Sequence, residues 1–296
     1  MAASRAVHQI ELPFEIVAPD PMTAPILFNS PHSGSVYPET FIATSKLDPL
    51  TLRRSEDCYV DELFAGVVGL GAMMMRAHFP RAYIDVNREP YELDPEMFSE
   101  PLPPLANTRS LRVAGGLGTI PRVVSEAAEI YDAPLPLAEA QQRIDQLYKP
   151  YHSQLSALLD NIQREFGAAL LIDCHSMPSL ARDRRPVRPD FVLGDRYSIS
   201  CAPEIVDAAE RHLKSRGYTV ACNRPYAGGY ITQRYGVPRN GLHALQIEVN
   251  RALYLNERTL EKSAGFGELA VNLTEFGAAM IEVANTSFSA TRCAAE

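Results

Sequence analysis

Short apolar runs that end in polar residues recur along the chain, and segments with helical spacing separate them. The clearest run covers residues 168–172 and leads directly into Asp173, His175 and Ser176, after which Pro178 ends any further strand pairing. An apolar run without alternation predicts a strand that is buried on both faces of a sheet. We therefore expect the polar residues that follow it at the carboxyl edge of the sheet, where open α/β folds bind their ligands.

Two other stretches repeat this order of an apolar run and a polar turn. Residues 24–28 lead into His32, and residues 82–86, which predict a further strand, lead into Asn87 and Arg88. A single histidine after a strand is more often structural, but the repetition favours a shared site. A planar guanidinium beside a neutral amide suits bidentate binding of a carboxylate, and a salt-bridged structural arginine is the alternative.

A helical pattern over residues 55–71 begins with two carboxylates. Ser55 is expected to be the N-cap, with Glu56 and Asp57 in the first turn, where negative charge suits the helix dipole. Capping alone would account for both carboxylates. A side chain in the first turn also points out of the scaffold, so it can take part in a site as well.

Residues 244–251 alternate with a period of two, which predicts a strand. The odd-numbered positions are apolar up to 249, and the even-numbered positions from 246 to 250, Glu248 among them, are polar. A strand that lines a cavity and an edge strand with one wet face both show this pattern. Residues 137–166 predict one long amphipathic helix that Pro150 kinks or divides.

Strand and helix patterns alternate almost throughout the chain. This order predicts an α/β fold, a three-layer sandwich with a central, mostly parallel mixed sheet. Nothing in the 296 residues marks a boundary, so we expect a single domain over residues 1–296.

The composition, 46% hydrophobic and 22% charged, is that of an ordinary globular protein. With 28 Lys and Arg against 36 Asp and Glu, the net charge of −8 argues against nucleic acid or an anionic membrane as partner. No apolar run approaches the ~20 residues of a membrane span, and the first residues lack a signal-peptide core, so cytoplasm is the expected location. The five cysteines are odd in number and scattered, which indicates reduced thiols.

The polar residues can be assembled into a candidate metal site. His32 and His175 each follow an apolar run, and a carboxylate begins a predicted helix between them. Two imidazoles and one carboxylate, with water in the fourth position, form a known catalytic zinc set, and such ligands suit zinc better than magnesium or calcium. The spacing is too long for a local motif, so these residues alone leave structural roles open.

Five motifs in the same order, from about residue 25 to residue 254, resemble the N-formylglutamate amidohydrolase family. They are Pro31-His-Ser-Gly34 with Tyr37-Pro38, Asp57 with Leu63, Tyr83-Ile-Asp-Val-Asn-Arg88, Asp173-Cys-His-Ser176, and Gln246-Ile-Glu-Val-Asn-Arg251. That family is similar in fold to zinc carboxypeptidases, desuccinylases and aspartoacylases. The resemblance therefore implies a phosphorylase/hydrolase-like α/β fold of the zinc-exopeptidase type.

The resemblance also implies a ligand set for Zn²⁺, namely His32, Asp57 and His175. Carboxypeptidases use the pattern His-x-x-Glu, whereas Ser35 stands at the glutamate position here. The carboxylate ligand must then come from elsewhere in the chain, and Glu56 competes with Asp57 for this role.

By the same resemblance, Glu248 is the general base, and Asn87 with Arg88 binds the substrate carboxylate. Arg251 is the next candidate for the carboxylate if Arg88 is structural. The tetrahedral oxyanion would be stabilised by Arg88, Arg122 or Tyr230, among which the sequence does not decide. The implied substrate is a small anionic N-acyl amino acid, with N-formyl-L-glutamate as the type case.

Two other classes of function stay open from the sequence. A cysteine-dependent hydrolase could use Cys174 beside His175, but adjacent strand residues point to opposite faces and make a poor nucleophile–base pair. A non-enzymatic ligand-binding protein with the same fold is the other class. The complete set of His32, Asp57, His175 and Glu248 argues against it, because a binding protein needs no general base. The sequence does not determine the oligomeric state.

Overall fold

The structure, a computed structural model, describes residues 10–124, 127–179 and 189–295. Contacts between residues divide the chain into two compact units. We name residues 16–30, 57–76 and 155–296 the sheet unit, and residues 1–15, 31–56 and 77–154 the loop unit. Within the described ranges, no helix is both long and apolar enough to cross a membrane.

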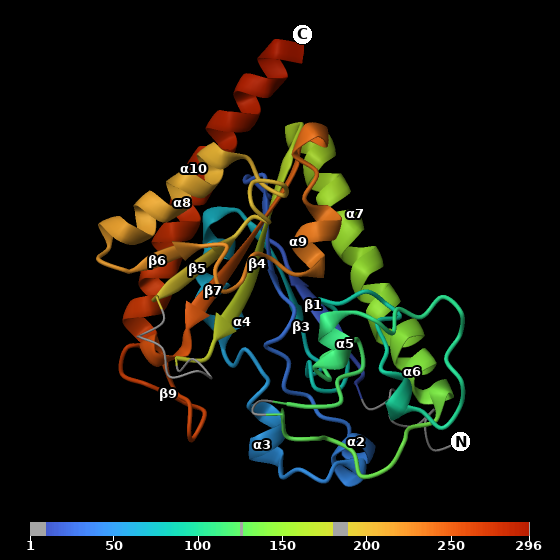
Figure 1. Cartoon of the computed structure of the whole chain (residues 1–296). Helices are drawn as coiled ribbons and strands as arrows, with labels where there is room; N and C mark the ends of the chain where they lie inside the picture. The colour runs from blue at the N-terminus through green and yellow to red at the C-terminus, as the bar shows by residue number, and fades with distance from the viewer. Residues whose placement is uncertain (1–9, 125–126, 180–188, 296) are drawn as a thin grey trace. The chain divides into compact units, whose positions relative to one another are not determined.

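A mixed sheet holds the sheet unit together. Over the described residues it has seven strands in the order β1-β3-β2-β4-β7-β5-β6 (Figure 1). Strand β2 is parallel to β3 and β4, and β4 is parallel to β7, whereas β5 is antiparallel to β7 and parallel to β6. The predicted α/β fold with a mostly parallel mixed sheet is therefore confirmed. The strands are β1 (Phe14–Val17), β2 (Ile26–Ser30), β3 (Met73–Ala77), β4 (Ala169–Met177), β5 (Phe191–Gly194), β6 (Val220–Cys222) and β7 (Leu242–Asn250).

One face of this sheet is apolar and is covered by helices. Phe28, Ile172 and Leu245, from three neighbouring strands, are fully buried in one core cluster with residues of these helices. The helix α10 (Phe266–Ala295) packs on α4 (Val60–Phe64), on the 3₁₀ helix η1 (Ala65–Leu70) and on α8 (Pro203–Ser215) (Figure 1). Burial of these apolar residues supplies the main driving force for folding of the unit.

The opposite face of the sheet carries buried polar residues, which lie side by side on the neighbouring strands β4 and β7. Because successive strand residues alternate between faces, Asp173 and His175 of β4 point away from the core cluster, as Gln246 and Glu248 of β7 do. The register pairs Asp173 with Gln246 and His175 with Glu248. The helix α9 (Tyr230–Tyr235) packs on β7 and β4. The expected two-faced pattern of residues 244–251 is confirmed, and the strand is interior to the sheet.

The remaining helices belong mainly to the loop unit. They are α2 (Glu39–Thr44), α3 (Pro49–Arg53), η2 (Pro95–Met97), α5 (Leu111–Ala114), α6 (Leu137–Arg143), the π-helix η4 (Ile144–Tyr148) and α7 (Lys149–Phe166), whose last part lies in the sheet unit. The π-helix ends two residues before Pro150, which has no N–H for the helical ladder, so the predicted division of residues 137–166 is confirmed. Short elements complete the sheet unit: η5 (Pro238–Asn240), η6 (Arg251–Leu253), β8 (Leu255–Asn256) and β9 (Glu261–Lys262).

The helix expected from residue 55 begins later than its sequence pattern indicates. Helix α4 starts at Val60, and its N-cap is Tyr59, which has the left-handed backbone conformation with φ of 62°. The Ser55 hydroxyl donates to Leu52 O and caps nothing. Glu56 and Asp57 therefore precede the helix, and the capping role expected for them is wrong.

The strand predicted over residues 82–86 does not form. These residues lie in turns and loop, with Tyr83 N and Ile84 N donating to Pro80 O, because a short apolar run suits any buried segment and not only a strand. Strand β4 continues through the polar residues to Met177, directly before Pro178, where strand pairing was expected to end, and it stays paired with β7 as far as Asn250. Asp173 and His175 therefore lie inside the strand, where the ladder fixes their backbone.

Candidate active site

His175 is held between two carboxylates of the sheet unit. Its Nε2 lies 2.9 Å from Asp173 Oδ2, and its Nδ1 lies 3.1 Å from Asp57 Oδ2. All three side chains are buried. Burial alone would lower the pKa of His175, but the charge and hydrogen bond of Asp173, followed by the contact with Asp57, outweigh it and raise this pKa well above its usual range.

Asp173 is itself braced from the neighbouring strand. Asn29 of β2 stands beside it in the register and donates from Nδ2 to Asp173 Oδ1 at 2.8 Å. One oxygen of Asp173 thus faces the imidazole and the other faces an amide. The arrangement fixes the ring of His175 with its Nδ1 directed at Asp57.

In the loop unit, His32 has a similar carboxylate behind it. His32 Nε2 lies 2.8 Å from Asp85 Oδ1, and Asp85 also accepts from Asn87 N at 2.9 Å and from Arg81 Nη2 at 2.9 Å. Burial by itself raises the pKa of Asp85, but Arg88, His32 and Arg81 outweigh it and hold this pKa well below its usual range. Asp85 is therefore a carboxylate when it contacts the imidazole.

Two of the three predicted ligands lie together in the sheet unit. Asp57 and His175 are both buried, and His175 Nδ1 lies 3.1 Å from Asp57 Oδ2. His32, the third predicted ligand, is buried in the loop unit. Glu56 also belongs to the loop unit, where it accepts from Tyr37 OH at 2.7 Å and from Arg53 Nε at 3.1 Å. This geometry favours Asp57 over Glu56 as the carboxylate ligand.

The donor chemistry of this set fits zinc. Both imidazoles turn Nε2 towards a buried carboxylate, which leaves Nδ1 as the ligand atom, and such carboxylate–histidine pairs are usual behind metal-bound histidines. Donors about 2.0–2.2 Å from one tetrahedral ion lie roughly 3.4 Å apart. The 3.1 Å between His175 Nδ1 and Asp57 Oδ2 is close to that separation.

Glu248 stands next to His175 on the neighbouring strand. It is 7% exposed, and its Oε1 accepts from Gln246 Nε2 at 2.9 Å. The same amide accepts at Oε1 from Gly229 N at 2.8 Å, so Gln246 links the predicted base to the loop before α9. Gln246 was not among the predicted site residues; its place two positions before Glu248 on the same strand face is the signal that could have identified it.

Arg88 and Asn87 lie beside the Asp85–His32 pair. Arg88 donates from Nε to Leu117 O at 2.8 Å and from Nη1 to Asn87 O at 2.7 Å, and its Nη2 lies 3.4 Å from Asp85 Oδ2. Burial lowers the pKa of Arg88 to about 10, although Asp85 opposes the shift, so the guanidinium stays charged at neutral pH. Among the described contacts, Arg88 therefore has a clear structural role, and a substrate contact would have to use its remaining N–H groups.

The other predicted substrate residues differ in their surroundings. Arg122 is ion-paired with Asp94 at 2.9 Å and with Glu129 at 3.2 Å, and its side chain is 30% exposed. Tyr230 begins α9 directly after Gly229, and its hydroxyl accepts from Arg234 Nη1 at 3.3 Å. These contacts give Arg122 a surface role in the loop unit.

Arg251 contacts Asp57 directly. Its Nη2 donates to Asp57 Oδ1 at 3.1 Å, and its Nε donates to Ser176 Oγ at 3.0 Å. Burial would lower the pKa of Arg251, but Asp57 and neighbouring groups raise it. This arginine is a partner of a candidate metal ligand.

Cys174 lies on the wrong face of the sheet for a nucleophile. It is fully buried in the apolar core cluster, on the face opposite His175. Burial, together with the charge of Asp173, raises the pKa of its thiol well above the usual range. A neutral thiol without solvent access cannot act as a nucleophile.

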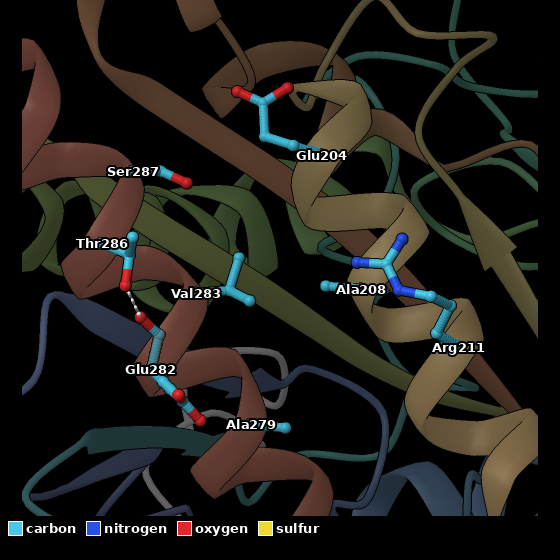
Figure 2. A pocket seen from close by; sticks show the side chains of 8 residues that line it. All are labelled: Glu204, Ala208, Arg211, Ala279, Glu282, Val283, Thr286 and Ser287. Carbon is cyan, nitrogen blue, oxygen red and sulfur yellow. Dashed lines mark hydrogen bonds between the residues drawn. The ribbon is translucent and has the colours of Figure 1, made fainter.

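The sheet unit also carries a groove. It runs between α8 and α10, the helices that cover the apolar face (Figure 2). In Figure 2 the Glu282 backbone accepts a hydrogen bond from Thr286. The groove is lined by Glu204, Ala208, Arg211, Ala279, Glu282, Val283, Thr286 and Ser287. None of the predicted site residues lines it.

Fold and side chains together define an α/β protein with a buried histidine–aspartate pair at its central sheet. The family model of N-formylglutamate amidohydrolase matches residues 24–255. The chain belongs to the N-formylglutamate amidohydrolase family, and it is a hydrolase of amide bonds.

Individual relatives agree with this assignment. The N-formylglutamate deformylase of Pseudomonas putida is 28% identical over 240 residues, which cover 79% of this chain and 82% of that protein. The deformylase of Pseudomonas aeruginosa is also 28% identical, over 238 residues, covering 79% and 83%. The crystal structure of an N-formylglutamate amidohydrolase from Ralstonia eutropha JMP134 is 37% identical with a TM-score of 0.88, covering 93% of this chain and 99% of that one. A gene product of Agrobacterium tumefaciens, 18% identical with a TM-score of 0.64 and coverage of 92% and 94%, shares the fold.

Proposed function

We propose that the chain is a zinc-dependent amidohydrolase that removes the acyl group from a small N-acyl amino acid, with N-formyl-L-glutamate as the type substrate. The observation that carries the proposal is the buried contact between His175 Nδ1 and Asp57 Oδ2 in the sheet unit, because both side chains can ligate a metal ion. The names of the relatives support the substrate, since two of them are N-formylglutamate deformylases.

In this proposal His32, Asp57 and His175 hold the ion. A bound zinc supplies a water with a pKa of about 7 and polarises the amide carbonyl. Asp85 and Asp173 keep the two imidazoles oriented and increase their basicity as ligands.

Glu248 is the general base. Its carboxylate accepts a proton from the attacking water and then delivers it to the leaving amine nitrogen. The balance is one N-acyl amino acid and one water giving one carboxylic acid and one amino acid, so N-formylglutamate gives formate and glutamate. Gln246 holds the carboxylate of Glu248 through its 2.9 Å hydrogen bond.

Asn87 and Arg88 bind the substrate carboxylate, which lets a chain of net charge −8 hold an anion. Arg88 lies one carboxylate away from His32, through Asp85, so the proposed carboxylate contact is next to one proposed metal ligand. Arg88 and Tyr230 are the candidates for stabilising the oxyanion. Arg122 is a weaker candidate for this role, because its guanidinium is already ion-paired with Asp94 and Glu129.

The test is an assay of the purified full chain with N-formyl-L-glutamate, following formate and glutamate release, before and after removal of metal by a chelator. We expect activity to fall on chelation and to return when zinc is added back. Hydrolysis that is unaffected by complete metal removal would contradict the zinc mechanism. Absence of hydrolysis by the zinc-loaded protein would contradict the proposed substrate.

A further inference from the structure

Arg251 and Ser176 together hold one oxygen of Asp57. Arg251 Nη2 donates to Asp57 Oδ1 at 3.1 Å, and Ser176 Oγ donates to the same oxygen at 3.1 Å. Arg251 Nε donates to Ser176 Oγ at 3.0 Å, which closes the triangle. Arg251 and Ser176 are each 6% exposed and Asp57 is 1% exposed, so water competes little for these hydrogen bonds.

The two oxygens of Asp57 therefore have different surroundings. Oδ1 faces two donors, whereas Oδ2 faces His175 Nδ1 at 3.1 Å. Rotation of the carboxylate that turned Oδ1 towards an ion would break both contacts. The guanidinium is planar and its donors have a fixed geometry, so it restrains the carboxylate more firmly than a lysine would.

We infer that Arg251, with Ser176, is a positioning residue that holds Asp57 as a ligand through Oδ2 alone. The inference rests on the proposed metal site. A carboxylate that binds through one oxygen leaves coordination positions for water and substrate, which a catalytic zinc site requires. It also gives Arg251 a different role from the substrate contact predicted from the sequence.

Loss of Arg251 has two effects of opposite sign on metal affinity. A buried cation next to the site repels a divalent ion, so its removal by itself would tighten binding. Its removal also frees Asp57 to rotate, which weakens binding if Arg251 positions the ligand. Weaker zinc binding without Arg251 therefore indicates that Arg251 positions Asp57, whereas tighter binding indicates that it is only a nearby positive charge.

The experiment measures the zinc dissociation constant of the full-length chain by competition with a chromophoric chelator. We expect Arg251→Met to weaken zinc binding by roughly 10- to 100-fold and Ser176→Ala to weaken it less. Arg216→Met removes an exposed ion pair with Glu275 and is the charge-matched control, with unchanged affinity expected. Unchanged or tighter binding in folded Arg251→Met would overturn the inference.

Cobalt substitution gives a second, spectroscopic readout. With one of the two donors to Oδ1 removed in Arg251→Met, we expect Asp57 to bind through both oxygens, raising the coordination number and weakening the visible absorption of bound Co²⁺. If circular dichroism shows that Arg251→Met is unfolded, Arg251→Lys takes its place, because lysine keeps the positive charge but lacks the planar guanidinium and its paired donors. Zinc affinity and cobalt spectra of Arg251→Lys identical to wild type would overturn the inference. Failure of the wild-type chain to bind zinc would overturn the proposed function and this inference together, whereas a zinc-binding wild type with an unaltered variant would overturn the inference alone.

Discussion

Asp173 lies directly behind His175, with Asp173 Oδ2 2.9 Å from His175 Nε2. The two residues are two positions apart on β4, so their side chains share one face of the sheet. Asp85 stands in the same relation to His32 Nε2, at 2.8 Å, although Asp85 comes from a turn of the loop unit. Both candidate ligands thus meet the same requirement, a ring whose orientation is fixed by a carboxylate at Nε2.

Asp173→Asn is expected to weaken zinc binding by roughly 10- to 100-fold, because an amide orients the imidazole less firmly and does not increase its basicity. The measurement is the zinc dissociation constant of the folded variant. Asp190→Asn makes the same change at a surface contact with Thr219 and is the control. Equal affinities of Asp173→Asn and the control would show that Asp173 has no part in the metal site.

Asp57 and Glu56 are adjacent in sequence, so substituting each in turn tests which of them is the carboxylate ligand. Asp57→Asn is expected to abolish tight zinc binding and activity, since it replaces the negatively charged ligand of the proposed set with a neutral amide. Glu56→Gln is expected to keep about one zinc per chain, because Glu56 is bonded to Tyr37 and Arg53 instead. Elemental analysis of both purified variants checks this. Metal loss in Glu56→Gln with retention in Asp57→Asn would reverse the assignment.

Glu248→Gln is expected to retain fold and zinc while turnover drops by roughly 10²–10⁴, the usual contribution of a positioned base. Steady-state kinetics together with metal content measure the two effects separately. Glu204→Gln, in the groove between α8 and α10, removes an exposed carboxylate and serves as control. If Glu248→Gln keeps the wild-type rate, Glu248 is not the general base.

Gln246→Leu is expected to lower kcat by roughly 10- to 150-fold without loss of zinc, since it removes a hydrogen bond to the Glu248 carboxylate. Gln246→Glu keeps the acceptor for Gly229 N but places a second carboxylate against Glu248, so we expect it to be at least as damaging. In the Glu248→Gln background, Gln246→Leu should lower kcat little further. If the two substitutions instead lower kcat by independent factors that multiply, Gln246 does not act through Glu248.

Arg88→Ala is expected to lower kcat/KM for an acidic N-acyl amino acid by roughly 30- to 5,000-fold, the usual range for breaking a buried charge pair. The matching uncharged amide substrate should lose much less. The comparison must use zinc-loaded protein, because Arg88 also contacts Asp85 behind His32. Equal losses on the two substrates would confine Arg88 to its structural contacts and leave the substrate carboxylate without its proposed partner.

Several features of this protein follow from the sequence alone. The apolar run before Asp173 and the alternation around Glu248 predicted two central strands, because side-chain periodicity is a local property of the backbone. The order of short motifs identified the family and, through it, the residues His32, Asp57 and His175. Adjacent strand residues point to opposite faces, which already placed Cys174 away from His175.

Only the tertiary structure decided which polar residues meet. Ser55 looked like a cap and residues 82–86 like a strand, but packing of the loop unit overrode both local preferences. The contact of Asp57 with His175, the partner of Arg251 and the link from Gln246 to Gly229 all depend on contacts between residues far apart in the chain. Such contacts carry no periodic signal in the sequence, because they arise when strands from distant segments align in register and bring their buried polar groups within hydrogen-bonding distance.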